Sequence, residues 1–245
     1  MVILFSPSEG KRKGGDGPSL VPSSFLFPER FTQRMAVLEQ YQTIIQKGNI
    51  TELSDLFGIK DEKEFQRYTH SLDTAATMKA IERYDGVAYD YLQYHQLEKQ
   101  AQEYIDRNVI IFSNLFGPIR AADMIPDYKL KQGSSIGTFA PEKFYKKHFS
   151  DVLDQMIGKQ DVLDLRAGFY DKFYTCVHPP TTLKFLKEGK VVSHWAKAYR
   201  GIVLREAAKY QIDSLADFLA LRIEGLELLE VNETAKKREV IYTIG

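Results

Sequence analysis

The stretch Asn108–Gly133, NVIIFSNLFGPIRAADMIPDYKLKQG, leads from an apolar run into a series of polar residues. Its start, Val109–Phe112, is apolar and partly β-branched, which is typical of a strand covered on both faces. Ser113 and Asn114 follow at once, and Gly117-Pro118 comes next, before Arg120, Asp123 and Tyr128. The stretch therefore predicts a buried strand with polar side chains directly after it.

Strands and helices interleave along the remaining sequence. Val2–Phe5 and Asp161–Arg166 have the pattern of further buried strands, and apolar residues three or four apart predict a helix from Pro28 to Gly48. The other expected elements are helices over 51–56, 61–70 and 141–156, mainly helical structure over 71–107, a short strand over 127–133, a hairpin over 181–199 that turns at Glu188-Gly189, a helix pair over 200–221 and two closing strands over 226–245. Because hairpins require antiparallel pairs, the sequence predicts one compact α/β (α+β) domain over residues 1–245, with a mixed sheet and flanking helices.

The composition is that of an ordinary globular protein. The 245 residues are 44% hydrophobic and 27% charged, and no apolar run approaches the roughly 20 residues that cross a bilayer. The first apolar run is too short for a signal peptide, and a single cysteine, Cys176, cannot form an internal disulfide. We therefore expect a cytoplasmic protein with no membrane partner. Cys176 is expected to be a half-buried small hydrophobe, and the scattered histidines predict neither a metal site nor a cofactor.

The charges balance overall but are unevenly distributed. The chain holds 33 Lys or Arg and 33 Asp or Glu, whereas Lys172–Lys209 holds eight Lys or Arg and two acids, a net charge of +6. A neutral protein with such a segment can present a positive cleft to a phosphate-bearing partner, because the local potential governs close association. The same charges could also be spread over several solvated faces.

The loop after the first strand, SPSEGKRKGGDG, is the first candidate site. It is not a Walker A loop, because Phe5 and Arg12 stand where that motif requires Gly and Ser or Thr. No G-x-G-x-x-G motif supports a dinucleotide site either. Two interpretations stay open. Either the loop is a mobile surface segment, or it lines a pocket at the carboxyl end of the strand with Ser6, Ser8, Glu9 and Lys11.

The second candidate site lies within the opening stretch. Arg120 and Asp123 are three residues apart, so on a helical turn they could pair with each other or bind a polar ligand together, with Tyr128 nearby. Asp164 and Arg166, at the end of a predicted strand, present the same choice on one strand face.

The third candidate site is SHWAKAYRGIVLREAAKYQIDSLADFLAL, residues 193–221. In a strand, Lys197 would share a face with Trp195, while Arg200 and Arg205 would begin the next helix, where an anion is favoured. A helix, a tight turn and a second helix with basic residues also describe a helix-hairpin-helix DNA-binding element. A plain antiparallel helix pair has the same pattern.

Together these stretches resemble the YaaA family of bacterial peroxide-stress proteins over nearly the whole chain. SNLFGPIRAADMIPDYKLKQG at 113–133 resembles the central family signature, S-x-L-[YF]-G-x-[LI]-R-x-x-D-x-[IM]-x-x-Y-[RK]-L-x-x-G. SPSEGK at 6–11, YDGVAY at 84–89 and HWAKAYRGIVLR at 194–205 resemble three further motifs. Other members place Lys where Glu9 stands, and DLRAGFY at 164–170 differs from the Asn-Leu-Ala-Ser form of many members.

The resemblance implies a single domain with a positively charged cleft, a helix-hairpin-helix-like element and affinity for DNA. It also implies a cytoplasmic role in limiting peroxide damage, linked to lower free intracellular iron. Carried over by position, the cleft residues are Ser6, Glu9, Lys11, Arg120, Asp123, Tyr128, Lys197 and Arg200, with Arg205 inside the closing matched block.

Three functional hypotheses follow. The first is a DNA-binding stress protein that contacts phosphates with little sequence preference, through Lys11, Lys197, Arg200 and Arg205. The second is an enzyme for a small anionic or nucleotide-like ligand, with Glu9 or Asp123 as general base and Lys197 as electrostatic stabiliser or nucleophile. The third is an interaction protein whose charged cleft is incidental.

Overall fold

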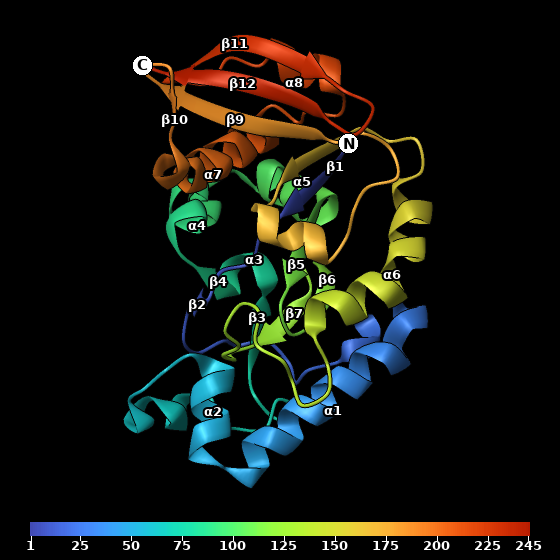
Figure 1. Ribbon diagram of the computed structural model, residues 1–245, viewed down its shortest axis with the longest axis vertical. Coiled ribbons are helices and arrows are strands. Elements are labelled where there is room, and N and C mark those ends of the chain that lie inside the picture. The colour runs from blue at the N-terminus through green and yellow to red at the C-terminus, as the bar shows by residue number, and fades with distance from the viewer.

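The computed structural model describes residues 1–245, apart from the side chains of Ser193 and His194. Its centre is a mixed sheet of eight strands with the order β11-β12-β9-β8-β1-β5-β6, and β10 pairs with β9 (Figure 1). The strands are β1 (Val2–Phe5), β5 (Val109–Ser113), β6 (Gly117–Arg120), β8 (Val162–Leu165), β9 (Thr181–Lys187), β10 (Lys190–Val191), β11 (Leu226–Glu233) and β12 (Arg238–Ile244). The predicted α/β fold with a mixed sheet is confirmed.

Helices cover this sheet and extend beyond it. They are α1 (Phe31–Lys47), α2 (Ile50–Phe57), α3 (Ala80–Arg83), α4 (Val87–Leu92), α5 (Lys99–Asn108), α6 (Pro141–Ile157), α7 (Ser193–Lys209) and α8 (Leu215–Ala220). Two small antiparallel pairs, β2 (Gly10–Lys11) with β4 (Tyr84–Asp85) and β3 (Thr77–Lys79) with β7 (Met124–Pro126), connect the sheet to α1 and α2 at the far end of the molecule (Figure 1). Among the described residues, no helix is both long and apolar enough to cross a membrane.

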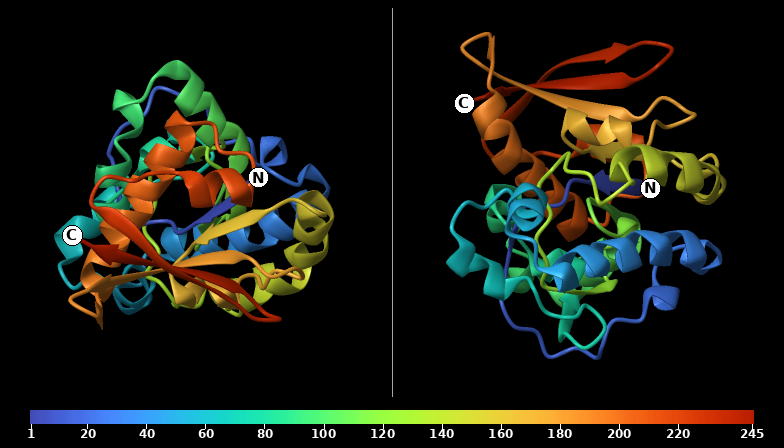
Figure 2. Two further views of the ribbon diagram at one scale, coloured as in Figure 1. Left: turned by 90° about the horizontal axis from the view of Figure 1, so that it is seen from above. Right: turned by 60° about the horizontal axis from the view of Figure 1, so that its bottom comes forward.

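The central strands are buried because both of their faces are covered. All residues of β1, β5 and β8 are buried, as the continuous apolar runs predict. β5, β1, β8, β9 and β12 run parallel, whereas β6 and β11 pair antiparallel at the two edges. The two views of Figure 2 show helices on both sides of this sheet. The carboxyl ends of the five parallel strands therefore meet at one edge.

The order of the strands reverses at β1. After β1 the chain builds β5 and β6 on one side, and then β8, β9 and β12 on the other side. β1 and β8 are neighbours, with Phe5 opposite Leu165 at their carboxyl ends. In open α/β sheets, ligands bind outside the carboxyl ends of strands at such a reversal. The topology thus indicates the end of β1 and β8 as the place for a site.

α7 packs closely against α4 beside the carboxyl ends of β1 and β8. A Cβ atom on Gly201 would lie 2.0 Å from the carbonyl oxygen of Ala88, so only glycine allows the two backbones to approach this closely. α4 and α7 lie side by side in Figures 1 and 2. The Arg-Gly pair of the closing motif therefore has a packing role as well as a charge.

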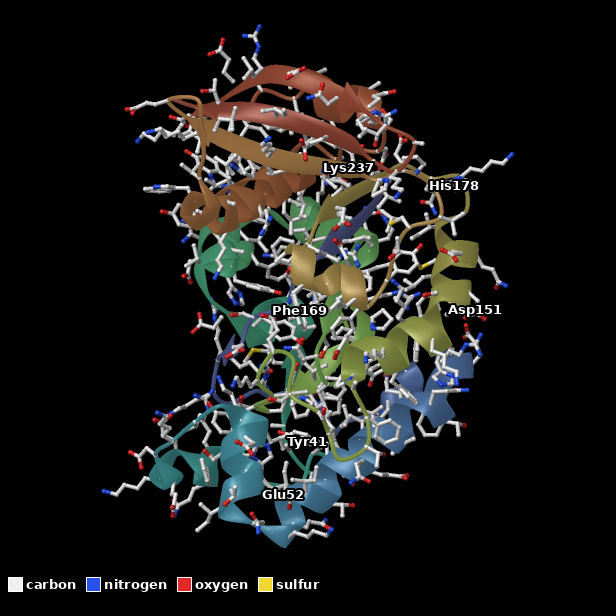
Figure 3. The ribbon with its side chains drawn as sticks, viewed as in Figure 1. Tyr41, Glu52, Asp151, Phe169, His178 and Lys237 are labelled. Atoms are coloured by element: carbon white, nitrogen blue, oxygen red, sulfur yellow. The ribbon has the colours of Figure 1, made fainter. Side chains whose placement is uncertain are left out.

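Residues 127–133 are not the predicted strand. Tyr128 and Leu130 are buried and alternate with lysines, which is the pattern that suggested a strand. Their backbone, however, bonds to helices: Tyr41 Oη of α1 donates to the Lys129 carbonyl over 2.8 Å, and Lys131 N donates to Leu56 of α2. Tyr41 points inward from α1 in Figure 3. Buried side chains and lysines do alternate in this segment. The backbone hydrogen bonds at Lys129 and Lys131, however, are made with residues of helices and not with a neighbouring strand.

The predicted hairpin over 181–199 is correct only in its first half. β9 and β10 turn at Glu188-Gly189, where both residues have positive φ. Residues 193–199 belong to α7, so the period along them is 3.6 and not two. Lys197 consequently shares a helix face with Arg200, and Trp195 is 48% exposed. The high helix propensity of the alanines in this segment outweighs the apparent strand pattern.

Candidate functional site

A cavity of about 490 Å³ opens where β1 and β8 end. We call it the β1–β8 pocket. Several segments line it. They are residues 5–9 at and after the end of β1, residues 86–89 at the start of α4, Leu165 at the end of β8 with Ala167 and Tyr170 after it, Gln132, and Lys197 and Arg200 of α7. The cavity thus lies at the place that the strand order indicates, and its volume falls within the roughly 300–1,000 Å³ range of small-molecule sites.

Ser6 ties three elements together at the floor of the pocket. Its Oγ accepts a hydrogen bond from Ala167 N over 2.8 Å, and its carbonyl accepts one from Tyr89 Oη over 2.8 Å. The Tyr89 ring packs edge-on against Phe5, with 5.4 Å between ring centroids. The loop after β1 is therefore fixed to the segment after β8 and to α4, rather than being a mobile surface segment.

The start of α4 approaches the same loop closely. Ser8 Oγ donates a hydrogen bond to the carbonyl of Asp85. Gly86 has φ +149°, and a Cβ there would lie 2.7 Å from Ser8 Oγ. Glycine at this position permits both the backbone conformation and the contact.

The Glu9 carboxylate has a defined orientation on one wall of the pocket. Its Oε1 accepts a hydrogen bond from Gln132 N over 2.9 Å, and its Oε2 is 3.6 Å from Lys129 Nζ. The Glu9 side chain is 47% exposed, whereas that of Lys129 is 16% exposed. The carboxylate is therefore anchored from the protein side while still open to the pocket.

α7 supplies a cationic wall. Lys197 and Arg200 are three residues apart on one helix face, and both line the pocket. Burial lowers the pKa of the Arg200 guanidinium, and the Asp164 carboxylate opposes that effect. Among the described side chains, neither cation has a hydrogen-bond or ion-pair partner within contact distance. The wall thus carries two positive groups that no described protein group neutralises directly.

Tyr170 and the Gln132 side chain form a polar end of the pocket. Burial raises the pKa of Tyr170. Asn114 follows β5 and is 6% exposed, and its Oδ1 is buried with no hydrogen-bond partner in the described structure. Asn114 therefore lies outside the lining, and the polar side chains that line this end are Tyr170 and Gln132.

Comparison with known proteins identifies the family. The family model described as "Peroxide stress protein YaaA" matches residues 1–231. The chain belongs to the YaaA family. A Campylobacter jejuni relative, "Uncharacterized protein Cj0984", is 48% identical over 244 residues and covers 100% of this chain and 99% of its own length. "UPF0246 protein SCO2297" from Streptomyces coelicolor is 30% identical over 221 residues, which are 84% of this chain and 82% of that protein.

Several of the YaaA motifs meet in the pocket. SPSEGK supplies Ser6 and Glu9, HWAKAYRGIVLR supplies Lys197 and Arg200, and YDGVAY supplies the wall at 86–89. Gln132 comes from the end of the central YaaA signature. Tyr89, Gln132 and Tyr170 were not among the predicted site residues. Tyr89 closes a motif that had been recognised, so the motif could have indicated it.

Lys11 and Tyr128 lie behind the pocket and not in its lining. Lys11 is 7% exposed, and its Nζ is 4.0 Å from the Tyr128 ring centroid. Lys11 Nζ donates to the carbonyls of Ser8 and Glu9 over 3.2 and 3.4 Å. Tyr128 Oη hydrogen bonds to the hydroxyls of Tyr84 and Ser113. Both residues support the loop that forms the pocket wall.

Arg120, Asp123 and Arg205 lie away from the pocket. Asp123 is buried, and its Oδ2 accepts hydrogen bonds from the backbone N–H groups of Arg120 (2.8 Å) and Leu26 (3.0 Å). Arg120 is exposed at the end of β6, so the pair sits in a strand and turn rather than on a helix. Arg205 is five residues after Arg200 on α7, and it bonds to Gln93 over 2.7 Å and to Glu206. The 3.6-residue period places it on a different face.

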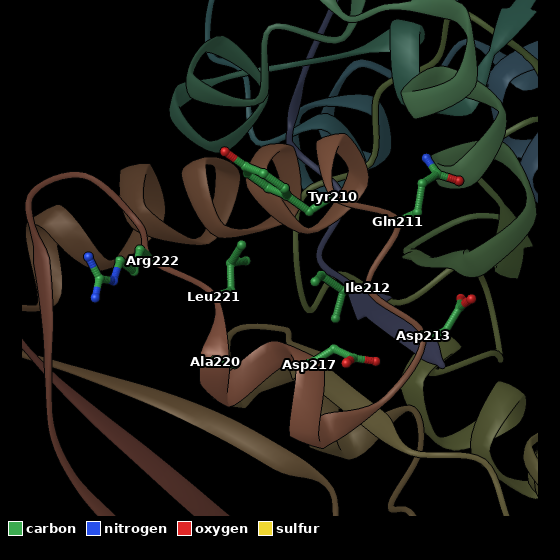
Figure 4. Close-up of a pocket in the computed structure, with 8 residues that line it drawn as sticks. All are labelled: Tyr210, Gln211, Ile212, Asp213, Asp217, Ala220, Leu221 and Arg222. Carbon is green, nitrogen blue, oxygen red and sulfur yellow. The ribbon is translucent and has the colours of Figure 1, made fainter.

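The turn between α7 and α8 is acidic. As predicted, the two helices follow each other through a short turn, and a cavity of about 480 Å³ lies beside it (Figure 4). Two acids, Asp213 and Asp217, border this cavity, and Arg222 is the one cation among its described lining residues. A phosphate requires donors and cations, so the charges at this turn do not favour a phosphate contact. DNA binding by this helix pair stays a prediction.

Cys176 is half-buried, as expected. Burial raises the pKa of its thiol to about 12. Since the thiolate is the reactive form, this environment disfavours reaction of Cys176 with an oxidant.

Proposed function

We propose that the protein acts in the cytoplasmic response to peroxide stress and that its β1–β8 pocket binds a small anionic ligand through Lys197 and Arg200. The family supports the first part, because its model is described as a peroxide stress protein. Two cations without described protein partners support the second part. Apolar walls beside those cations would strengthen their attraction for an anion, since water screens the charges less there.

The arrangement suits a phosphate or carboxylate group. An arginine can bind such a group through two parallel N–H···O bonds, and a nearby lysine adds a point charge. Glu9 is the one carboxylate among the described lining residues. It is therefore the group that would accept a proton if the ligand reacts, because Asp123, the other predicted base, lies outside the lining.

Arg200→Ala combined with Lys197→Ala is expected to abolish anion binding. Inorganic phosphate at ten times its Kd should raise the Tm of the unmodified chain by about 3–5 °C. The double variant should show no rise, because both phosphate-binding cations are lost. Differential scanning fluorimetry with a phosphate titration measures this.

Arg205→Ala is the matched control for that experiment. Arg205 lies on the same helix but on another face, so the variant should keep the full phosphate response. An equal rise in the double variant would overturn the proposal. In cells that lack the protein, the unmodified chain should restore survival in peroxide and the double variant should not.

A second candidate function, binding of single-stranded DNA, is favoured by an exposed surface beside the pocket. Lys187 and Lys190 are exposed on the β9–β10 hairpin. Trp195 is 48% exposed at the start of α7, and Lys197 is exposed two residues later on that helix. Exposed aromatic rings among cations are typical of proteins on which single-strand bases stack.

Under this second proposal, DNA affinity is expected to depend on salt and on Trp195. We expect Lys187, Lys190 and Lys197 each to contact one phosphate. Three such contacts predict that raising the salt concentration from 50 to 200 mM lowers the affinity for DNA roughly 10- to 20-fold. Trp195→Ala should lower it further by about 1–3 kcal/mol. Fluorescence anisotropy with a labelled oligonucleotide measures both. Tyr210→Ala, which removes an exposed ring at the acidic turn, should change nothing; affinity that is independent of salt would rule this function out.

A further inference from the structure

The β1–β8 pocket has two chemically different walls. Lys197 and Arg200 of α7 offer only positive charge and hydrogen-bond donors. The loop wall offers the anchored Glu9 carboxylate and the Gln132 amide. A ligand that satisfies only the cationic wall would leave the loop wall without a partner.

Between these walls the lining is apolar and partly aromatic. Phe5, Tyr89 and Leu165 contribute to it. The Phe5 and Tyr89 rings pack edge-on against each other, with 5.4 Å between their centroids. Fixed aromatic and aliphatic surfaces of this kind favour a flat, weakly hydrated ligand body. The cavity of about 490 Å³ is also larger than a lone phosphate ion needs.

We infer that the anionic ligand is a free nucleotide whose base carries an exocyclic amino group, with its phosphate at Lys197 and Arg200 and its amino group donating to Glu9. The inference rests on the proposed anion-binding function and specifies the class of ligand. The base lies against the apolar lining, between the two walls.

Glu9 determines the choice of base in this arrangement. An ionised carboxylate only accepts hydrogen bonds, and Gln132 N and Lys129 approach it from the protein side. The lone pairs that face the pocket therefore require a donor. An oxo group in place of the amino group would face the carboxylate with like partial charge.

Cytidine monophosphate and uridine monophosphate test this inference, because they differ in an amino or oxo group on otherwise similar rings. The unmodified chain should bind cytidine monophosphate roughly tenfold more tightly, as is usual for the loss of one well-placed hydrogen bond to a base edge. Adenosine and inosine monophosphates should show the same order. Isothermal titration calorimetry gives the four affinities.

Glu9→Gln should remove the preference while keeping the binding. A glutamine can present either its oxygen or its amide nitrogen to the pocket, and its oxygen can still accept from Gln132 N. The two pyrimidine nucleotides should then bind within about twofold of each other. Glu39→Gln is the matched control, because Glu39 is exposed on α1, and this variant should keep the tenfold preference.

The outcomes separate this inference from the proposed function. Equal affinities of the unmodified chain for cytidine and uridine monophosphate overturn the inference, as does a preference that survives in Glu9→Gln. If inorganic phosphate still binds in a manner that requires Arg200, the proposed function stands in either case. If neither phosphate nor any nucleotide binds, the proposed function fails as well.

Discussion

Asp164→Asn is expected to lower the free energy of unfolding by about 3–5 kcal/mol, because it removes the buried counter-charge of a buried guanidinium, whose other acidic neighbour, Asp171, is exposed and 3.7 Å away. The side chains of Asp164 and Arg166 are 7% and 2% exposed. Arg166 Nε and Nη2 donate to the two carboxylate oxygens over 2.9 and 2.7 Å. Burial lowers the pKa of Arg166 and the Asp164 carboxylate raises it. Because arginine stays protonated in proteins, the guanidinium keeps its charge when the carboxylate is replaced by an amide. Urea denaturation at pH 7 measures the loss.

Asp151→Asn is the matched control. Asp151 pairs with Arg30 at the surface and is 57% exposed, so the same chemical change there should cost less than 1 kcal/mol. Comparable losses at the two positions would contradict the argument, which depends on burial. Replacing both partners, as in Asp164→Leu with Arg166→Met, should recover most of the stability, since no unpaired charge then stays buried.

The Asp164–Arg166 pair also supports the pocket. Arg166 Nη1 donates to the carbonyls of Tyr170 and Tyr174, each over 3.1 Å, and Tyr170 lines the cavity. The guanidinium lies over the Phe112 ring of β5 at 4.6 Å. Asp164→Asn is therefore expected to weaken phosphate binding in addition to lowering stability, whereas Asp151→Asn should leave phosphate binding unchanged.

The central strands could be predicted from the sequence because their continuous apolar residues indicate burial. Val2–Phe5 and Val109–Phe112 contain only apolar residues, and such runs occur where both faces of a strand are covered. Residues 127–133 show the limit of this reasoning. Burial of alternate side chains is visible in the sequence, but the partner that satisfies the backbone is not, and here helices α1 and α2 provide it.

The pocket could be predicted in part, because side chains that directly follow a strand are carried to the sheet edge. Ser6 and Glu9 follow β1 and reach the pocket, as expected. Lys197 also reaches it, although the strand period proposed for its segment was wrong. Tyr170 and Gln132 were missed, since each depends on how a loop folds back over the sheet. Spacing alone could not separate Asp123, which caps a turn, from a ligand-binding acid.

A buried lysine gives the second large expected effect. Lys11 is 7% exposed, and burial is the main reason that its pKa falls from 10.5 to about 7. The charges that face it contribute in both directions: Lys129 and Arg67 lower the pKa further, whereas Asp127 and Glu9 raise it. In the unfolded chain the ammonium is hydrated and keeps its ordinary pKa.

This difference makes stability depend on pH in a definite direction. Between pH 7 and 10.5 the unfolded chain holds a proton that the folded chain has released, so the free energy of unfolding contributed by Lys11 rises with pH. Below pH 7 both states hold the proton, and the folded protein bears the full cost of burying the charge. The contribution of Lys11 is thus least favourable in acid.

Lys11→Met should remove this dependence, because methionine fills similar space without a charge. Between pH 6 and pH 9 the unmodified chain should gain roughly 2–3 kcal/mol relative to the variant, so any advantage of the variant is greatest at pH 6. Urea denaturation at both pH values measures the difference. Lys13→Met, at an exposed position two residues away, should follow the unmodified chain. Parallel pH profiles for Lys11→Met and the unmodified chain would mean that the Lys11 amine titrates alike in both states, and that the loop after β1 does not hold a buried charge.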